Sequence, residues 1–351
     1  MRHPLILLVL AACTEAPPAA DPSPTEIARR APIPTQRPAI VPVQYAVPPP
    51  SQTPSSRPPP SRPPPRQKIT RGPAGAKRVG TGDYWFGTGP GYVYSCQNDE
   101  LRTWPKAGGG EFSHGPCHGA FQFLGDDSGT YFCDSDGVKR IPDQGDPELV
   151  TGNAKGCILD AIDDKFVYYV VPGFEGVKDP GLYRVAKRGG DPSKLHATRK
   201  GEQIFVVLDG EDLWMGAWGA GTISKMPKAG GTLTTVVTGQ RGIVDLQIDG
   251  DSLYWYPENA GEIRKRAKRG GPISVVAKGL SIEPMLVHDG HVFWFVGVRN
   301  NAQTLMHLAP KATEPKVLAS GLMSPSLVID DEGVFFQEFG TAGIYMLPLP
   351  D

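Results

Sequence analysis

The amino-acid sequence predicts an all-β fold: a seven-bladed β-propeller, with six blades as the alternative, preceded by a disordered proline-rich tether. Three marks recur in the same phase over residues 76–351, namely an Asp-Gly or Asp-Asp pair, an aromatic strand and a Gly-Gly turn. Because three independent marks keep one phase, the sequence predicts a series of like modules.

One repeat, residues 248–290, shows the unit. Asp249-Gly250 is a pair that closes tight hairpins, residues 253–256 are aromatic and strand-like, and Gly270-Gly271 signals a turn before a strand at 273–277. Four short strands in about forty residues is the period of a propeller blade. Seven aromatic strands predict seven blades: residues 92–94, 131–132, 167–169, 213–214, 253–255, 292–294 and 334–336.

The last repeat has an inner, a second and a third strand but lacks an outer one. Residues 76–85 precede the first aromatic strand, and we expect them to supply both this missing outer strand and the inner strand of the first blade. A strand from the opposite end of the domain would close the ring and remove an exposed sheet edge.

Residues 1–12 have the pattern of a signal peptide, with a basic start and an apolar run at 5–10. A membrane span needs about 20 apolar residues, so this run predicts targeting. Leu10-Ala11-Ala12-Cys13 resembles the bacterial lipoprotein signal, which implies diacylation of Cys13 and cleavage before it. A buried cysteine after an ordinary cleavable signal is the alternative. Thr14 is not the aspartate of inner-membrane retention, which implies an outer-membrane lipoprotein facing the periplasm or the cell surface.

Residues 13–75 are rich in proline and predict an extended, disordered linker, because they offer little to bury and few backbone donors. Residues 1–78 contain eleven Lys or Arg against three Asp or Glu, whereas the rest contains 25 basic and 34 acidic residues. The basic tether could lie against an anionic cell-wall polymer, with the acidic head held away from it. Simple solvation of the charges is the alternative, and we expect no nucleic-acid partner.

The head, residues 76–351, resembles a known repeat family. Leu253-Tyr254-Trp255 followed by Gly261-Glu262-Ile263-Arg264 is similar to the Y-W-T-D repeat of receptor propellers, with its G-x-I-x-R second half, and to NHL-like repeats. The head also resembles the propellers of myxobacterial-type envelope lipoproteins. The resemblance implies a fold and a tendency to bind partners. Because Tyr256-Pro257 replace the Thr-Asp of the motif, it implies no particular chemistry.

Four cysteines remain after Cys13, and an even count in an exported chain predicts two disulfides. Cys96 and Cys133 each end an aromatic strand, and we expect Cys117 and Cys157 each to begin the next inner strand. This favours Cys96–Cys117 and Cys133–Cys157, each worth about 3 kcal/mol in the chain-entropy model. Cys117–Cys133 with Cys96–Cys157 is the competing pairing.

The segment His114-Gly115-Pro116-Cys117-His118 is the densest apparent cluster of metal ligands. Zinc needs further ligands, and Cys96 or Cys133 could serve only if the disulfides did not form. The glycine-rich segments are followed by no helix that could bind a phosphate, and no G-x-S-x-G motif occurs. We therefore predict no metal, no cofactor and no enzymatic activity.

The loops after the aromatic strands and the loops into the inner strands differ between repeats, and we expect them to form one funnel-shaped face. Exposed aromatic residues among charged ones are typical of recognition surfaces, although ordinary solvated loops are the alternative. The candidate binding residues on this face are Trp218, Arg241, Glu258, Asn259, Glu283, Arg299, Asn300 and Glu338.

The sequence thus predicts a monomeric, lipid-anchored propeller that binds a protein or glycan ligand, or acts as a scaffold, in the cell envelope. A propeller enzyme of the lyase or lactonase type is one alternative, because Glu258, Glu283 and Glu338 could act with a nearby histidine. His288 and His291 are expected at the opposite face, which counts against it. A scaffold for outer-membrane assembly is another alternative.

Overall fold

The structure is a computed structural model that describes residues 75–82, 86–118, 120, 122–142, 146–154, 156–173, 177–258, 260–279, 285–297, 302–323, 326–338 and 343–350. These residues form 28 strands and no helix. Accordingly, the described part of the chain contains no helix able to cross a bilayer. The predicted signal peptide, Cys13 and all of the predicted linker except Gly75 lie outside the described residues.

The first sheet, here called the double sheet, has eight strands in the order β5-β4-β3-β2-β6-β7-β8-β9. Its strands are β2 (Phe86–Gly89), β3 (Tyr92–Gln97), β4 (Glu100–Pro105), β5 (Phe112–Pro116), β6 (Phe123–Asp126), β7 (Gly129–Cys133), β8 (Val138–Ile141) and β9 (Glu148–Thr151). Five four-stranded sheets follow, and each is named here by its first strand.

The β10 sheet and the β14 sheet each run in chain order. Their strands are β10 (Ile158–Ile162), β11 (Phe166–Val171), β12 (Gly181–Ala186), β13 (Ser193–Ala197), β14 (Ile204–Asp209), β15 (Asp212–Ala217), β16 (Thr222–Pro227) and β17 (Thr234–Val237).

The β18 sheet and the β22 sheet repeat this order, and the β26 sheet has the order β1-β28-β27-β26. Their strands are β18 (Ile243–Asp249), β19 (Ser252–Pro257), β20 (Glu262–Ala267), β21 (Ser274–Lys278), β22 (Met285–His288), β23 (His291–Val296), β24 (Ala302–Leu308), β25 (Lys316–Met323), β26 (Ser326–Asp330), β27 (Gly333–Glu338), β28 (Gly343–Leu347) and β1 (Lys77–Thr81).

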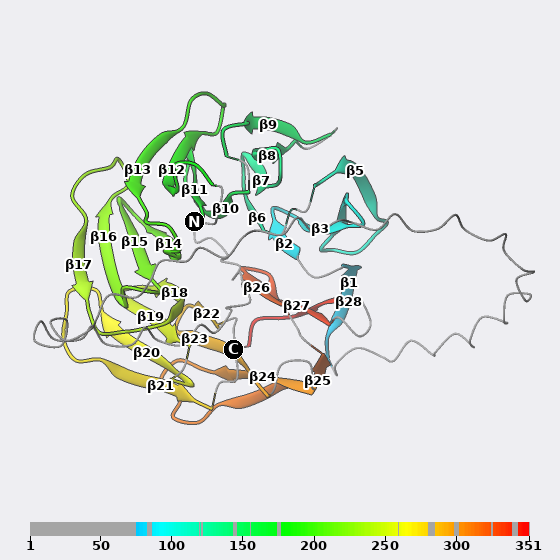
Figure 1. The fold of residues 1–351 in the computed structure, drawn as a ribbon. Coiled ribbons are helices and arrows are strands. Elements are labelled where there is room, and N and C mark those ends of the chain that lie inside the picture. Colours follow the sequence, from blue (N-terminus) through cyan, green and yellow to red (C-terminus); the bar gives the residue numbers. More distant parts are fainter. Residues whose placement is uncertain are drawn as a thin grey trace, which may run out of the picture. The chain divides into compact units, whose positions relative to one another are not determined.

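The inner strands form a closed ring. Each of β2, β6, β10, β14, β18 and β22 contacts the inner strand of the next four-stranded unit, and β26 contacts β2. Within each unit the strands are antiparallel and joined by hairpins, and the sheets fan outwards from this ring (Figure 1). The described residues therefore form an all-β propeller, as the repeats predicted.

The ring is closed by strand β1, which pairs with β28 from Lys77 opposite Met346 to Thr81 opposite Gly343. The expectation that residues 76–85 supply the missing outer strand is confirmed. The expectation that they also supply the first inner strand is wrong, because β2 begins at Phe86.

The number of separate sheets differs from the expected seven. Strands β2 and β6 form a direct parallel pair at Thr88 and Leu124, so the first two four-stranded units merge into the double sheet. Elsewhere in the described ring the inner strands contact one another without this pairing.

The side chains of the aromatic strands pack between neighbouring sheets and form much of the core. Tyr131, Tyr168, Trp255, Trp294 and Phe335 are all essentially buried on the second strands of their units. Each such side chain removes a large apolar area from water and contributes about 1.5–3 kcal/mol. This burial explains why the second strand carries the most regular sequence signal.

A recurrent ion pair joins neighbouring sheets. A lysine that follows the third strand of one unit pairs with an aspartate at the first hairpin of the preceding unit. These bridging ion pairs are Lys187 with Asp126, Lys228 with Asp163 (3.4 Å), Lys268 with Asp209 (2.6 Å) and Lys106 with Asp330 (2.8 Å). The last of them spans the closure of the ring.

Each bridging lysine is anchored in its own unit by its backbone. The N–H of Lys187, for example, donates to the carbonyl of Lys165 in the first hairpin of the same unit (2.9 Å). Its side chain then reaches the preceding unit, where the ammonium group also lies 5.3 Å from the ring centre of Tyr131. The bridging lysine thus contacts the hairpins of two units at once.

The environment of Asp126 keeps its carboxyl charged. Burial alone would raise the pKa of Asp126, but hydrogen bonds from Lys187 and Ser128 outweigh it and lower the pKa below its usual value. A carboxyl whose folded pKa is depressed stabilises the fold above its unfolded pKa of about 4, and this contribution is lost as the pH falls through the folded pKa. At neutral pH the pair is fully ionic.

We expect Lys187→Met to lower the free energy of unfolding by about 3 kcal/mol, because it leaves the nearly buried carboxylate of Asp126 unpaired. Urea unfolding followed by tryptophan fluorescence measures the loss. Lys225→Met is the matched control, since Lys225 also lies over an aromatic ring, that of Trp214. Its pair with Asp212 stays within one sheet and is well exposed, so its loss should cost less than about 1 kcal/mol. Equal losses in the two variants would contradict the role of the bridging pair.

Candidate functional site

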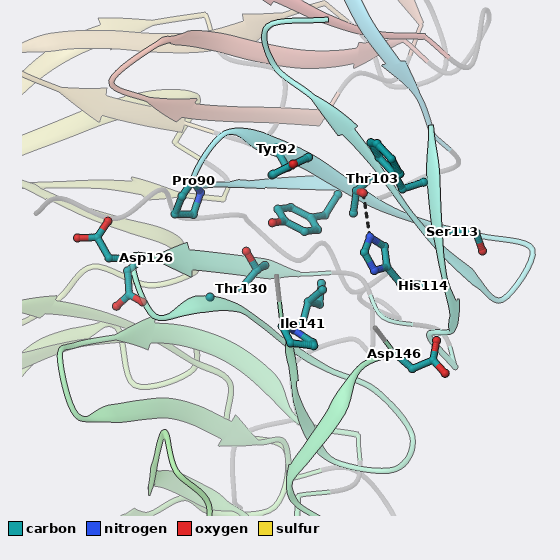
Figure 2. A pocket seen from close by; sticks show the side chains of 14 residues that line it. Pro90, Tyr92, Thr103, Ser113, His114, Asp126, Thr130, Ile141 and Asp146 are labelled. Carbon is teal, nitrogen blue, oxygen red and sulfur yellow. Dashed lines mark hydrogen bonds between the residues drawn. The ribbon is translucent and has the colours of Figure 1, made fainter. Parts of the chain in front are cut away.

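The interface between the two halves of the double sheet lacks a bridging ion pair. Where four other interfaces carry the aspartate and the lysine, the chain here has Gly89 at the end of β2 and Pro142 after β8. A cavity of about 600 Å³ lies at this interface, and Pro90 and Pro142 line it. We call it the wedge cavity (Figure 2).

Two glycines allow the sheets to merge beside this cavity. A Cβ atom on Gly125 would lie 2.6 Å from the Cα of Gly89 and 2.8 Å from the Oγ1 of Thr130. Only a residue without a side chain permits so close an approach of two backbones. The parallel pair of β2 and β6 therefore depends on glycine at position 125, whereas a Cβ atom on Gly89 would collide with the Thr130 hydroxyl.

Aromatic side chains line one wall of the wedge cavity. Tyr92 and Tyr94 project from alternate positions of β3, and Phe112 projects from β5. Tyr92 is 40% exposed and Phe112 is 51% exposed, which is unusual for large apolar rings in a folded domain. Thr130 and Ile141 belong to the facing half of the double sheet (Figure 2).

Polar groups lie among these rings. The Nε2 atom of His114 lies 3.0 Å from the Oγ1 of Thr103, and Asp126, Asp127 and Asp146 also line the cavity. The Oγ1 atom of Thr130 is buried and has no hydrogen-bond partner among the described residues. The wedge cavity thus combines exposed ring faces with carboxylate, imidazole and hydroxyl groups.

The structure brings together three of the eight residues predicted for the binding face. The Nε1–H of Trp218 donates to the Oε2 of Glu258 (3.1 Å), and the N–H of Gly242, next to the exposed Arg241, donates to the Trp218 carbonyl (3.1 Å). The Glu258 N–H donates in turn to the carbonyl of Gly242 (2.7 Å). This arrangement joins the β14 and β18 sheets, so at least Trp218 and Glu258 have a structural role.

The other predicted face residues are not brought into this group. Glu338 is half-buried at the end of β27, and Asn259, Glu283, Arg299 and Asn300 lie outside the described residues. The predicted face and the wedge cavity lie at opposite ends of the second strands. Trp218 of the predicted face follows the end of a second strand, whereas Pro90 and Asp127 of the wedge cavity precede the start of one. The binding role of the predicted face remains a prediction.

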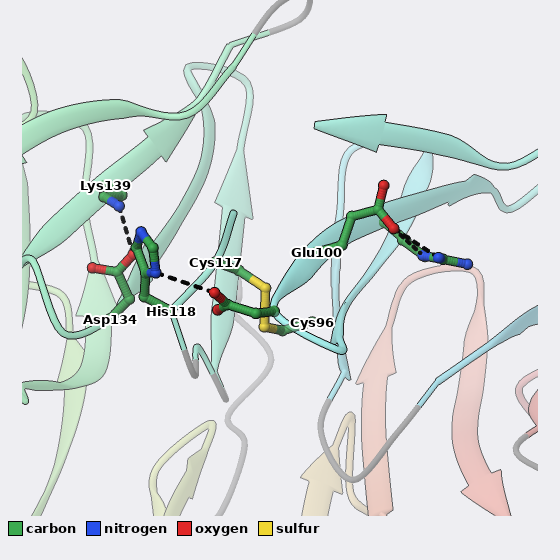
Figure 3. The surroundings of a disulfide bond; sticks show 8 residues. Cys96, Glu100, Cys117, His118, Asp134 and Lys139 are labelled. Carbon is green, nitrogen blue, oxygen red and sulfur yellow. Dashed lines mark hydrogen bonds and ion pairs between the residues drawn. A yellow bond between two sulfur atoms is a disulfide. The ribbon is translucent and has the colours of Figure 1, made fainter. Parts of the chain in front are cut away.

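Both favoured disulfides are present, Cys96–Cys117 and Cys133–Cys157. Cys157 directly precedes the inner strand β10, as expected. Cys117 does not begin an inner strand, since it follows the outer strand β5 and lies six positions before β6. The first disulfide therefore joins the second strand of its unit to the end of the same unit (Figure 3).

The apparent metal cluster is divided among different partners. Cys117 is in a disulfide, His114 bonds Thr103, and the Nδ1 of His118 lies 3.3 Å from Asp99 (Figure 3). Sulfur atoms of Cys96 and Cys117 lie near an Asp99 oxygen, but an intact disulfide offers no thiolate to a metal. The imidazoles of His114 and His118 thus contact Thr103 and Asp99 in this fold.

The wedge cavity was not predicted from the sequence. Asp126-Asp127 was interpreted as a hairpin pair, and the segment around His114 was considered only as a source of metal ligands. A usable signal was nonetheless present, because this is the interface at which both the recurrent aspartate and the recurrent lysine are replaced, by Gly89-Pro90-Gly91 and by Pro142. A break in a repeat marks a place where the repeated interaction is absent.

No protein-family model and no curated protein matches the chain. Among solved structures, virginiamycin B lyase from Staphylococcus aureus aligns over 78% of this chain and 98% of that chain, at 14% identity and a TM-score of 0.58. The computationally designed Ika8 protein aligns over 79% and 98%, at 15% identity and 0.50. PorZ, a surface component of the type-IX secretion system of Porphyromonas gingivalis, aligns over 79% and 40%, at 14% identity and 0.50.

At these identities the likeness shows the fold alone. Together with the closed ring of inner strands, it defines the class of this protein as an all-β propeller of repeated four-stranded units. Among the described residues, two disulfides add cross-links to the first three of these units.

We expect Gly125→Ala to lower the free energy of unfolding by about 1–3 kcal/mol, because the added methyl group would collide with the backbone of β2. Gly110→Ala is the control, since its methyl group would meet nothing within 4 Å. Chemical denaturation of both variants measures the difference. A Gly125→Ala variant as stable as Gly110→Ala would show that the two strands do not need this close approach.

Proposed function

We propose that this propeller is a binding module whose ligand site is the wedge cavity, and that the ligand is a saccharide. The observation that supports this proposal most strongly is the pair of exposed rings, Tyr92 and Phe112, in a cavity of about 600 Å³ that also presents carboxylate and hydroxyl groups. Sites for small ligands are typically concave, largely apolar and supplied with a few directed polar groups.

The chemistry of the lining favours a sugar. A pyranose ring has an apolar C–H face that packs on an aromatic ring and hydroxyl groups that bond to carboxylates. Tyr92 and Phe112 offer the faces, and Asp127, Asp146 and His114 offer polar atoms. The carboxylate of Asp126 accepts hydrogen bonds from Lys187 and Ser128, so it is held in one position.

The test uses the full chain on a glycan array, followed by calorimetry with the glycans that bind. We expect the double variant Tyr92→Ala/Phe112→Ala to weaken binding about tenfold or more, because it removes both stacking faces. Leu149→Ala, which truncates another exposed side chain outside the cavity, is the control and should bind as the parent does. Capture of a peptide partner in place of any glycan would overturn the saccharide assignment.

We also propose that the mature protein is an envelope lipoprotein carried on its proline-rich linker. The pattern that ends in Leu10-Ala11-Ala12-Cys13 supports this, and two disulfides accord weakly with an oxidising compartment. Two or more acyl chains on Cys13 would hold the protein firmly, since one chain binds membranes only marginally.

Replacing the anchor residue tests this proposal. We expect Cys13→Ala to move the protein from the detergent-rich to the aqueous phase when cell extracts are partitioned in Triton X-114. Cys133→Ala, which removes a cysteine of the head, is the control for loss of any cysteine. A parent protein that already partitions into the aqueous phase would contradict lipid anchoring.

The architecture is best described, we propose, as seven blades, with the double sheet counted as two blades that share the β2–β6 pair. The ring of inner strands supports this count. The likeness to a lyase supports no lyase activity, because it rests on fold at 14% identity. In the wedge cavity the imidazole of His114 hydrogen-bonds a buried threonine hydroxyl, so it is not a free general base. This arrangement accords better with a binding role than with catalysis.

A further inference from the structure

A second cavity, of about 220 Å³, lies inside the ring of inner strands. Asp160, Asp209, Gln247, His288 and Asp330 line it, from five successive inner strands. Glycines of two hairpin turns also line it, so it reaches the hairpin end of the ring. We call it the axial cavity.

Asp160 occupies an unusual position in this lining. It is 5% exposed and lies where the register of β10 against β11 is shifted by a bulge between Leu159 and Ala161. Its Oδ1 atom accepts a hydrogen bond from the N–H of Val206 on the next inner strand (3.3 Å). Its Oδ2 atom is buried and has no hydrogen-bond partner among the described residues.

Asp245 provides an internal comparison, because it makes the same kind of link from β18, two inner strands further round the ring. Its Oδ2 accepts a hydrogen bond from the N–H of Met285 on the next inner strand (3.2 Å), and its Oδ1 accepts one from Gln247 (3.1 Å). Both oxygens of Asp245 are therefore satisfied within the protein. Asp160 makes the same link between strands but keeps one oxygen unused.

The other acidic groups of the axial cavity already have partners. Asp209 pairs with Lys268 and Asp330 with Lys106, while Asp249 accepts the N–H of Gly290 (2.7 Å). His288 lies 3.7 Å from Asp289 and 3.9 Å from Asp331. The other inner strands that line the cavity each carry a charged or titratable group. In the portion of the ring that the structure describes, no lysine or arginine pairs with Asp160.

An unsatisfied buried carboxyl oxygen is costly. Leaving such a polar atom without a partner costs about 1–3 kcal/mol, which a bound donor would recover. Burial raises the pKa of Asp160 to about 8, and the single backbone hydrogen bond only partly offsets this effect. A cationic group beside the carboxyl would restore the charged form.

We propose that the axial cavity binds an ammonium or guanidinium group through Asp160. The site is distinct from the wedge cavity and does not rest on the saccharide proposal. A cation that donates hydrogen bonds satisfies the free Oδ2 atom of Asp160. The cavity is larger than an ion and matches the end of an amine side chain or of a small polyamine.

The geometry disfavours a bare metal ion. Among the described residues, the only three potential ligands whose donor atoms lie within 4.8 Å of one another are Cys96, Asp99 and Cys117, none of which lines this cavity. The axial carboxylates are therefore too far apart to surround one divalent ion. An organic cation, which carries several donors on a rigid frame, can bridge such a spacing.

Isothermal titration calorimetry of the full chain tests the proposal with agmatine, which carries both cationic groups, and with a blocked Ala-Arg-Ala peptide. Binding of the first points to a small amine, and binding of the second to a side chain of a partner. Affinity should rise about tenfold or more from pH 6 to pH 9, because Asp160 must ionise, and binding near neutral pH should release a proton. The proton release is read from the dependence of the heat on the buffer.

Asp160→Asn should weaken binding about tenfold or more, whereas Asp245→Asn should bind as the parent does. The Asp160→Asn variant retains His288, so any pH dependence of binding that is due to His288 persists in the variant. Tetramethylammonium, which is cationic but donates no hydrogen bond, should not bind. The proposal is overturned if neither probe binds at pH 9, if Asp160→Asn binds like the parent, or if Mg²⁺ competes with agmatine at equal affinity. Should Asp160→Asn fail to fold, the proton release of the parent decides the question.

Discussion

At four of its interfaces this propeller joins neighbouring units by one interaction, the bridging ion pair of a turn lysine with a hairpin aspartate. One such pair, Lys187 with Asp126, joins units that are consecutive in the chain. Another, Lys106 with Asp330, joins the first unit to the last across the closure of the ring. Hydrophobic burial holds the aromatic strands between the sheets but has no direction of its own. The ion pair, fixed by the backbone of one unit and reaching the next, supplies a defined register between them.

Both candidate sites arise where a repeated interaction is altered. The wedge cavity opens where Gly89 and Pro142 replace the bridging pair and two strands merge through Gly125. The axial cavity contains Asp160, which repeats the strand-to-strand hydrogen bond of Asp245 but lacks its second partner. In a fold built from like modules, the residues that recur serve the fold, and the departures are free to serve recognition.

Features that depend on residues close together in the chain could be predicted, whereas features that depend on contacts between units could not. Strand order, hairpins and the closure by β1 were predicted, because each depends on residues a few positions apart or on a count of strands per repeat. The disulfide pairing was also predicted, from the place of each cysteine in its repeat, although Cys117 does not begin an inner strand. The merging of β2 with β6 was missed, because it depends on how closely two backbones approach across an interface.

The amino-acid sequence by itself therefore determined the modules: their period, their aromatic second strands and the turn residues between them. Only the tertiary structure decided which lysine meets which aspartate, where a cavity remains open and which buried carboxyl lacks a partner. Partners such as Lys187 and Asp126 lie 61 residues apart and meet only when the sheets pack around the axis. Periodicity is a local property of the chain, whereas complementarity between units exists only after the ring has formed.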